Sequence, residues 1–197
     1  MARDPSDGIV DTVVKLGGGI LAHSEHLDDA LGAICHAAVT HRLLIVPGGG
    51  PFAEAVREVD HRLGLSSDAT HWMAVLAMDQ YAHLIADRLV RSALVVQRSE
   101  IVAALTSAKV PVLAPWRWLR KIDPLPHTWD VTSDSIAAWV AGRVGARHVV
   151  LIKPAHATGK DLVDVHFTRA LPARVTPFIT PIDQLDRLRT ALRGERT

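Results

Sequence analysis

Two apolar runs of this chain each stop at three consecutive glycines: VVKLGGG, which begins at Val13, and LLIVPGGG, which begins at Leu43. Neither run has the alternating polar positions of a half-buried strand, which is typical of strands covered on both faces in a parallel sheet. Apolar residues at helical spacing follow each glycine triplet. The pattern therefore predicts strand–loop–helix units, the building blocks of an α/β fold with a mostly parallel sheet.

The same alternation continues along the chain. We expect strands at residues 9–16, 42–46, 93–96, 110–113 and 148–153, and helices at residues 24–40, 51–63, 67–89, 99–105 and 134–144. Ser67 or Asp68, and later Ser133, are candidate N-caps, and Gly145 is a candidate helix stop. The sequence TPID, with Thr180 as the cap, predicts a last helix. Because 197 residues with 48% hydrophobic content support one sizeable core, we expect a single domain over residues 1–197.

Charge and cysteine content exclude several classes of protein. Twenty-two Lys and Arg against 21 Asp and Glu leave no basic domain or stripe, so no nucleic-acid partner is expected. The single cysteine, Cys35, allows no intramolecular disulfide and is expected to be a reduced core residue. The N-terminal MARDPSDG is not a signal peptide, and no apolar run approaches the roughly 18 residues of a membrane span. We therefore expect a cytoplasmic protein with no membrane partner.

The two glycine triplets are the first candidate site. Each could simply make a tight turn, but a glycine loop between a buried strand and a helix also lets backbone N–H groups approach an anion closely. Neither triplet matches GxxxxGK[ST] or GxGxxG. Two such loops at the carboxyl ends of strands favour two phosphate-bearing ligands that face each other. Lys15 would then be a point charge directed at the group between them.

Two further charged residues fit this interpretation. Asp134 falls at the start of a predicted helix, where it could be an ordinary first-turn carboxylate or could hold Lys15 or a metal ion. Lys153 ends a buried strand and could be a second phosphate contact or a solvated lysine. Eleven histidines are present, but no HxxxH or HExxH spacing lies on a convincing helix face and no cysteine accompanies them. No dedicated metal site is therefore expected.

Aromatic residues offer candidate contacts to an acceptor. Trp72, on the long helix at 67–89, could border a substrate or pack in the core. The segment APWRWLRKIDPLPHTWD, residues 114–130, is the least regular part of the chain. Its tryptophans, Trp129 among them, could cover an aromatic ring and pair with an ammonium group, or could form a subunit interface.

Three motifs in order, KxGGG, VPGGGPF and TSDSIAA, resemble the amino acid kinase superfamily over about residues 13–192. The segments HWMAVLAMDQYAHLIADRL and HTWDVTSDSIAAW look most like the branch that includes the aminomethylfuran phosphate kinase of methanofuran biosynthesis, a part of C1 metabolism. The resemblance implies a three-layer αβα sandwich, transfer of the terminal phosphoryl group of ATP, Mg²⁺ as the metal cofactor, and a homo-oligomer. The implied acceptor is a small phosphate monoester, with aminomethylfuran phosphate as the best single guess.

The resemblance also implies roles for individual residues. Lys15, Asp134 and Lys153 would be the catalytic residues, with Asp134 orienting Lys15 and the substrates. ATP would be held by Lys15, Gly17, Gly18, Gly19, Lys153 and Lys160. The acceptor would be held by Gly48, Gly49, Gly50, Trp72, Trp129 and Ser133. A phosphate acceptor is already anionic, so no general base is required, and positioning with charge neutralisation would carry the reaction.

The loop after Lys153 departs from the family pattern. The family usually has an acidic TDVDG-type segment there, whereas this chain has PAHATGK. Lys160 could supply positive charge in this loop. Two alternatives to the phosphate-monoester kinase therefore stay open. One is a kinase for another acceptor, such as a nucleoside monophosphate, and the other is a protein that keeps the fold and binds a ligand or oxyanion without catalysis.

Overall fold

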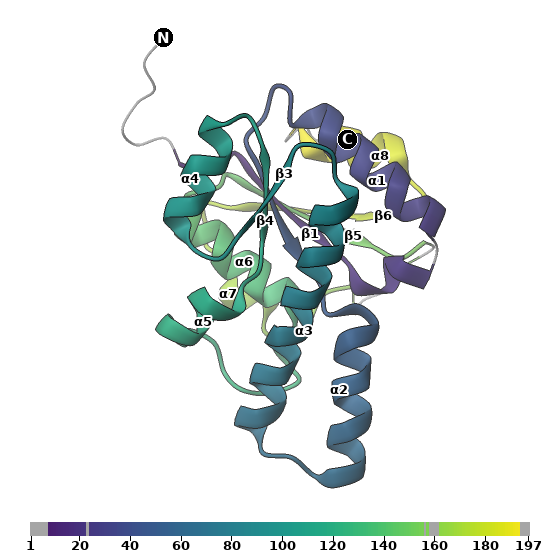
Figure 1. Ribbon diagram of the computed structural model, residues 1–197, viewed down its shortest axis with the longest axis vertical. Helices are drawn as coiled ribbons and strands as arrows, with labels where there is room; N and C mark the ends of the chain where they lie inside the picture. Colours follow the sequence, from purple (N-terminus) through teal and green to yellow (C-terminus); the bar gives the residue numbers. More distant parts are fainter. Residues whose placement is uncertain (1–7, 23, 156, 158–161, 194–197) are drawn as a thin grey trace.

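The computed structural model describes residues 8–22, 24–155, 157 and 162–193 (Figure 1). The strands are β1 (Thr12–Leu16), β2 (Leu43–Pro47), β3 (Ser92–Val95), β4 (Val110–Leu113), β5 (His148–Lys153) and β6 (Thr176–Pro181). The helices are η1 (Gly18–Ala22), α1 (Ser24–Ala37), α2 (Gly50–Leu63), α3 (Ser67–Arg88), α4 (Arg98–Thr106), α5 (Trp116–Ile122), α6 (Ser133–Val144), α7 (Phe167–Ala170) and α8 (Leu185–Leu192).

The six strands form one sheet in the order β3-β4-β2-β1-β5-β6, and every strand pairing among the described residues is parallel. From β1 the chain continues to β2, its neighbour on one side in the sheet, and from β5 it continues to β6, which lies on the opposite side. The adjacent strands β1 and β5 therefore mark a topological switch point, beyond whose carboxyl ends a ligand crevice is expected. Lys15 pairs in register with Val46 and Leu151 and lies one residue before the end of β1.

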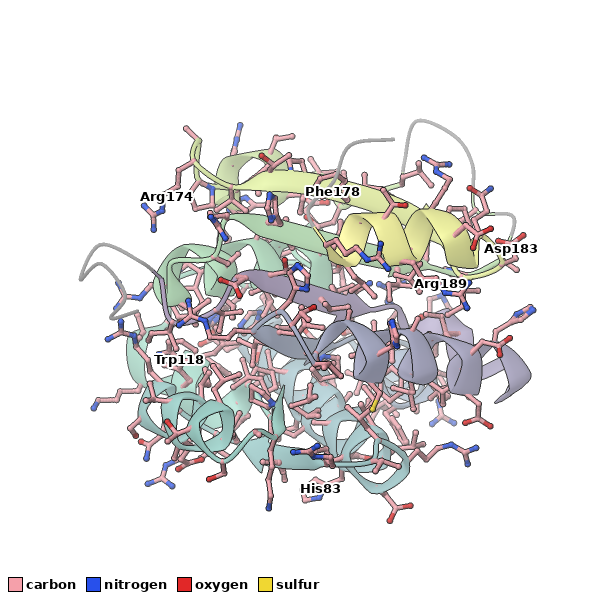
Figure 2. The ribbon with its side chains drawn as sticks, turned by 90° about the horizontal axis from the view of Figure 1, so that it is seen from above. His83, Trp118, Arg174, Phe178, Asp183 and Arg189 are labelled. Carbon is pink, nitrogen blue, oxygen red and sulfur yellow. The ribbon has the colours of Figure 1, made fainter. Side chains whose placement is uncertain are left out.

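Helices cover both faces of the sheet, which confirms the three-layer arrangement. On one face α1, α8 and the C-terminal half of α3 pack on alternate strand residues such as Val14 and Ile45. On the other face α4 and α6 pack on the intervening residues, such as Val13 and Leu44. Figure 2 shows α8 and α1 side by side along one face of the sheet. Helix α2 and the N-terminal half of α3 extend together beyond the sheet (Figure 1), and residues of both line the cavity described below.

Helix caps lie one residue earlier than the sequence predicts. Ser66, rather than Ser67 or Asp68, caps α3, and its hydroxyl accepts a hydrogen bond from the backbone N–H of Ala69. Thr132, rather than Ser133, caps α6. Gly145 ends α6 in the left-handed conformation, as predicted.

The predicted helix start at TPID is wrong. Thr180 and Pro181 belong to β6, which pairs with β5 at the edge of the sheet, and the last helix begins only at Leu185. Proline lacks the N–H that a central strand needs, but an edge strand tolerates it. Two short helices, α5 and α7, also lie where no regular structure is expected from the sequence.

The structure also bears on the expectations for Cys35 and for a membrane span. Cys35 is a free cysteine that is half-buried on α1 rather than fully enclosed in the core. Among the described residues, every helix is too short or too polar to cross a membrane.

Candidate functional site

The two glycine loops contact each other directly beyond the ends of β1 and β2. A Cβ atom on Gly18 would lie 2.2 Å from the backbone nitrogen of Gly50, and one on Gly48 would lie 2.7 Å from the nitrogen of Gly18. Gly50 has a positive φ of 56°, which only glycine adopts without strain. The bare backbones are therefore required because the loops pack against one another.

The first glycine of each triplet forms a backbone hydrogen bond with a neighbouring strand and is not free to bind an anion through its N–H. The N–H of Gly17 donates to the carbonyl of Ile152 at 3.0 Å, and the N–H of Gly48 donates to the carbonyl of Leu16 at 2.8 Å. These two N–H groups are already used, although both glycines are among the predicted ligand contacts. Gly18, Gly19, Gly49 and Gly50 instead line the cavity. Gly49 precedes the first turn of α2, where free N–H groups and the helix dipole favour an anion.

Asp134 lies between two lysines at the centre of the site. Its Oδ1 is 2.9 Å from the Nζ of Lys15, and its Oδ2 accepts a hydrogen bond of 2.6 Å from the Nζ of Lys153. The Lys15 ammonium is placed for an ion pair but is not aligned for a hydrogen bond to Oδ1. All three side chains are at most 11% exposed. The structure thus brings together the three predicted catalytic residues from β1, α6 and β5.

Opposing effects set the pKa of Asp134 and that of Lys153. Burial raises the pKa of Asp134, but the charges of Lys15 and Lys153 outweigh it, so the pKa lies below the ordinary value. Burial and the neighbouring charge of Lys15 lower the pKa of Lys153. Two buried ammonium groups share one carboxylate, and a bound phosphate oxygen would relieve their mutual repulsion.

Asp164 positions the start of α6 and was not identified from the sequence. Its carboxylate accepts hydrogen bonds from the N–H and hydroxyl of Thr132 at 2.9 and 2.8 Å, and from the N–H of Ser135 at 3.0 Å. These bonds hold the turn that carries Asp134. No local signal marks this residue, because Asp164 is 30 positions from Asp134 and lies in an irregular segment.

A cavity of about 540 Å³ opens from the glycine loops along α2 and α3. Its charged end contains Lys15, Asp134 and Lys153, with Ser133 beside them. Its remaining walls are formed by Leu21, Pro51, Ala53, Glu54, Arg57, Thr70, His71, Ala74, Val75, Met78, Thr128, Trp129, Val131, Thr132 and Ile136. The cavity is large enough for a small organic molecule and combines apolar wall residues with a few charged groups, as ligand pockets do.

Trp129 forms part of the far wall of this cavity. Its indole N–H donates to the carboxylate of Asp60 at 2.9 Å, and the guanidinium of Arg57 lies 4.7 Å from the centre of its ring. These contacts from α2 fix the ring against one wall. Trp129 therefore lines the cavity, and its contact with a substrate stays a prediction.

Trp72 is not among the residues that line the cavity; its neighbour His71 is. Trp72 is instead partly buried against the core, in contact with His127 and Arg120. Trp118, shown in Figure 2, is buried against Trp139 of α6, so it belongs to the core rather than to a substrate cover. Lys160, the remaining predicted ATP contact, lies outside the described residues.

Among the described residues, the lining carboxylates are those of Asp134 and Glu54. Asp134 is engaged by two lysines, which leaves little capacity to bind a divalent cation directly. A magnesium ion here would therefore depend on ligand phosphates and water, as it often does in kinase sites.

Comparison with known proteins relates this geometry to a family. The model of the amino acid kinase family matches residues 12–155 of the chain. A curated protein of Methanocaldococcus jannaschii, [5-(aminomethyl)furan-3-yl]methyl phosphate kinase, is 27% identical over 139 residues. That match covers 71% of this chain and 63% of the relative, so the chain spans less than two thirds of the relative's length.

Solved structures share the fold. Uridylate kinase from Archaeoglobus fulgidus superposes with a TM-score of 0.67 at 15% identity, covering 94% of this chain and 96% of that one. UMP kinase from Bacillus anthracis superposes with a TM-score of 0.71 at 15% identity, covering 94% and 92% of the two chains. At this identity the likeness concerns the architecture alone.

Proposed function

The chain belongs to the amino acid kinase family, and from that premise we propose that it transfers the γ-phosphoryl group of ATP to a small phosphate monoester. The observation that carries the proposal is the buried group Lys15–Asp134–Lys153 beside two glycine loops in contact. An oxygen of the acceptor phosphate would attack the γ-phosphorus while the bond to the bridging β–γ oxygen breaks. The products are ADP and a diphosphate ester.

The residues of the charged end would act through position and charge. Lys15 and Lys153 would neutralise the oxygens of the transferred group, where negative charge accumulates in the transition state. Asp134 would hold both ammonium groups in place and touch no reacting atom directly. Bound Mg²⁺ would supply further charge neutralisation at the ATP phosphates. The acceptor's attacking oxygen is already ionised at neutral pH, so no side chain has to remove a proton.

The glycine loops would divide the two substrates between them. The first loop, Gly18 and Gly19, follows β1 at the switch point beside Lys153 and suits the ATP phosphates. The second loop, Gly49 and Gly50, opens α2 and suits the acceptor phosphate. The rest of the acceptor would extend along α2 toward Trp129.

Aminomethylfuran phosphate is the acceptor that we propose. The 27% identical relative is named as a kinase of this compound, and the apolar cavity walls fit a small aromatic ring. The ring would pack between Val75, Met78 and Ile136. Glu54, the other lining carboxylate among the described residues, lies 3.7 Å from the guanidinium of Arg57 and would attract the ammonium group of such a substrate in its place.

Phosphorus NMR tests the proposal. The protein is incubated with Mg²⁺, ATP and a panel of phosphate monoesters that includes aminomethylfuran phosphate and uridine monophosphate. We expect new diphosphate resonances with the furan compound. They should vanish in Lys15→Met and persist in Lys109→Met, which changes an exposed lysine. If calorimetry shows that Mg·ATP binds but no acceptor is turned over, the acceptor is a different compound. If neither binding of Mg·ATP nor turnover is found, the proposed kinase activity is contradicted.

A further inference from the structure

Two histidines and two aspartates form a cluster where the first turns of α3 meet the segment after α5. His127 Nδ1 lies 2.6 Å from Asp68 Oδ1, and His127 Nε2 lies 2.7 Å from Asp123 Oδ1. The ring of His71 stacks on that of His127 with centroids 4.0 Å apart. One potential ligand atom from each of His71, Asp123 and His127 lies within 4.8 Å of the others.

The cluster has the layout of a metal site with an outer carboxylate. In protein metal sites, a ligating histidine commonly donates its second ring N–H to a carboxylate, which fixes the tautomer and the ring orientation. Asp68 is placed to hold Nδ1 of His127 in this way. The opposite nitrogen, Nε2, then points at the carboxylate of Asp123. Asp123 has a positive φ of 48°, a conformation that aspartate tolerates better than most residues.

We propose that His71, Asp123 and His127 bind one divalent transition-metal ion, such as Zn²⁺, with Asp68 as the outer carboxylate. Two imidazoles and one carboxylate favour a borderline ion of this class over Mg²⁺, which prefers oxygen ligands alone. Water or a ligand group in the cavity completes the coordination. This inference does not depend on the kinase activity.

Binding requires a rearrangement of the three ligand side chains. Ligand atoms of a tetrahedral zinc site are roughly 3.4 Å apart, given metal–ligand distances of about 2.0–2.2 Å. The distance between His127 Nε2 and Asp123 Oδ1 therefore has to lengthen from 2.7 Å, with loss of the proton that they share. Asp123 can move because its side chain is 48% exposed. The two imidazole rings have to tilt out of their stack so that the ion lies in the plane of each.

The position of the cluster connects it to the cavity. His71 is itself a lining residue, and Thr128 and Trp129, which follow His127 directly, line the same cavity. An ion held here would join α3 to the segment that carries Trp129. The part of the cavity wall that His71, Thr128 and Trp129 form would be fixed by the same ion.

Metal titration of untagged protein, stripped with a chelator, tests the proposal. Zn²⁺ binding is measured by calorimetry, and Co²⁺ binding by its visible absorption. We expect one ion per chain, with affinity unaffected by excess Mg²⁺. Asp68→Asn should weaken binding by about 10–100-fold, the usual effect of an outer partner. His71→Ala and Asp123→Ala should weaken it by more.

His83→Ala is the matched control. His83 lies on the same helix, is exposed, and points away from the sheet in Figure 2, so its loss should leave the titration unchanged. Circular dichroism of each variant verifies that it is folded, and the exposed Asp123 offers a ligand change with little structural cost. The proposal is overturned if no saturable binding occurs, if Mg²⁺ competes equally, or if folded His71→Ala and Asp123→Ala bind as the wild type does. In those cases the cluster is a hydrogen-bonded imidazolium between two carboxylates.

Discussion

At the residue scale, the buried charges are tolerated because each has a partner. Asp134, only 4% exposed, would be costly to bury alone, but two lysines contact it. Lysine and aspartate at these positions look like ordinary strand-end and helix-start residues in the sequence. Their grouping arises from the sheet, which brings β1 beside β5 and places the start of α6 above both. A buried carboxylate between two lysines is better suited to holding charges in place than to exchanging protons.

Asp79 is a half-buried carboxylate with no ion pair among the described residues, and it should make stability depend on pH. Burial raises its pKa to about 6 from 3.8, although the backbone N–H of Trp116 donates to it at 3.0 Å. Between these values the native state binds more protons than the unfolded state, so this group's contribution to stability falls as pH rises through that window. Asp79→Asn removes the charge and keeps an acceptor for Trp116.

We expect Asp79→Asn to raise the free energy of unfolding, with a gain about 1 kcal/mol larger near pH 7.5 than near pH 4.5 after allowance for solvent screening. Urea unfolding at the two pH values measures this difference. Asp186→Asn, which changes an almost fully exposed aspartate, is the control and should show no such dependence. An equal gain for Asp79→Asn at both pH values would contradict the assignment.

At the element scale, the contact between the two glycine loops is a strict requirement. In Gly18→Ala the new methyl group would lie 2.2 Å from the nitrogen of Gly50, and backbone atoms cannot yield as a side chain can. We expect a loss of about 1–3 kcal/mol in the free energy of unfolding, the usual cost of overpacking, together with a loss of phosphoryl transfer. Denaturant unfolding and the NMR assay measure the two effects.

Gly32→Ala is the control for Gly18→Ala, and its expected effect on the free energy of unfolding has the opposite sign. Gly32 lies within α1, and a Cβ there would meet nothing within 4 Å. Alanine in a helix interior is favoured over glycine, so stability should rise by about 0.5–1 kcal/mol while activity is kept. If Gly18→Ala behaved like Gly32→Ala, the loops would have room to separate, and their close contact would not be essential.

The sequence predicts the central elements well and the edges poorly. Strands β4 and β5 match their predicted ranges, because continuous apolar runs identify strands buried on both faces. The helix predicted from TPID fails because Pro177 and Pro181 can lie in an edge strand that pairs with β5. The local cap signal carries no information about that pairing. Helix α5 is missed because its seven residues are too short for helical periodicity to stand out.

The candidate site can be predicted only in part from the sequence, for a related reason. Motif residues such as Lys15 and Asp134 stand beside recognisable glycine or TSDS segments. Asp164 and the cluster of His71 and His127 have no such neighbours, and their partners lie about 30 or 56 residues away in the chain. Only the fold brings these residues together.

At the scale of the whole molecule, the cavity draws on both halves of the sheet. The first glycine loop and Lys153 come from the β1–β5 side, whereas the second loop and α2 come from β2. A protein that only stores one oxyanion would need one such anion site. A phosphoryl-transfer enzyme needs two, close together and open at the same time.

The requirement for two anion sites rather than one predicts how ligands stabilise the protein. A non-hydrolysable ATP analogue with Mg²⁺ and aminomethylfuran phosphate should each raise the midpoint of thermal unfolding. A ligand at about 100 times its Kd adds roughly 2.7 kcal/mol. For a domain of this size that corresponds to roughly 5–10 °C. Because the two proposed subsites are separate, both ligands together should raise the midpoint further than either does alone, less any repulsion between their phosphates.

Lys15→Met should reduce both shifts, because this lysine lines the same cavity as both loops. Thermal scans at fixed protein concentration, with ligand series taken to saturation, give the required comparison. A combined shift no larger than the greater single shift would mean that the ligands compete for one anion site. The molecule would then be a binder of single phosphates with a kinase fold, because two phosphates that cannot be bound together cannot exchange a phosphoryl group.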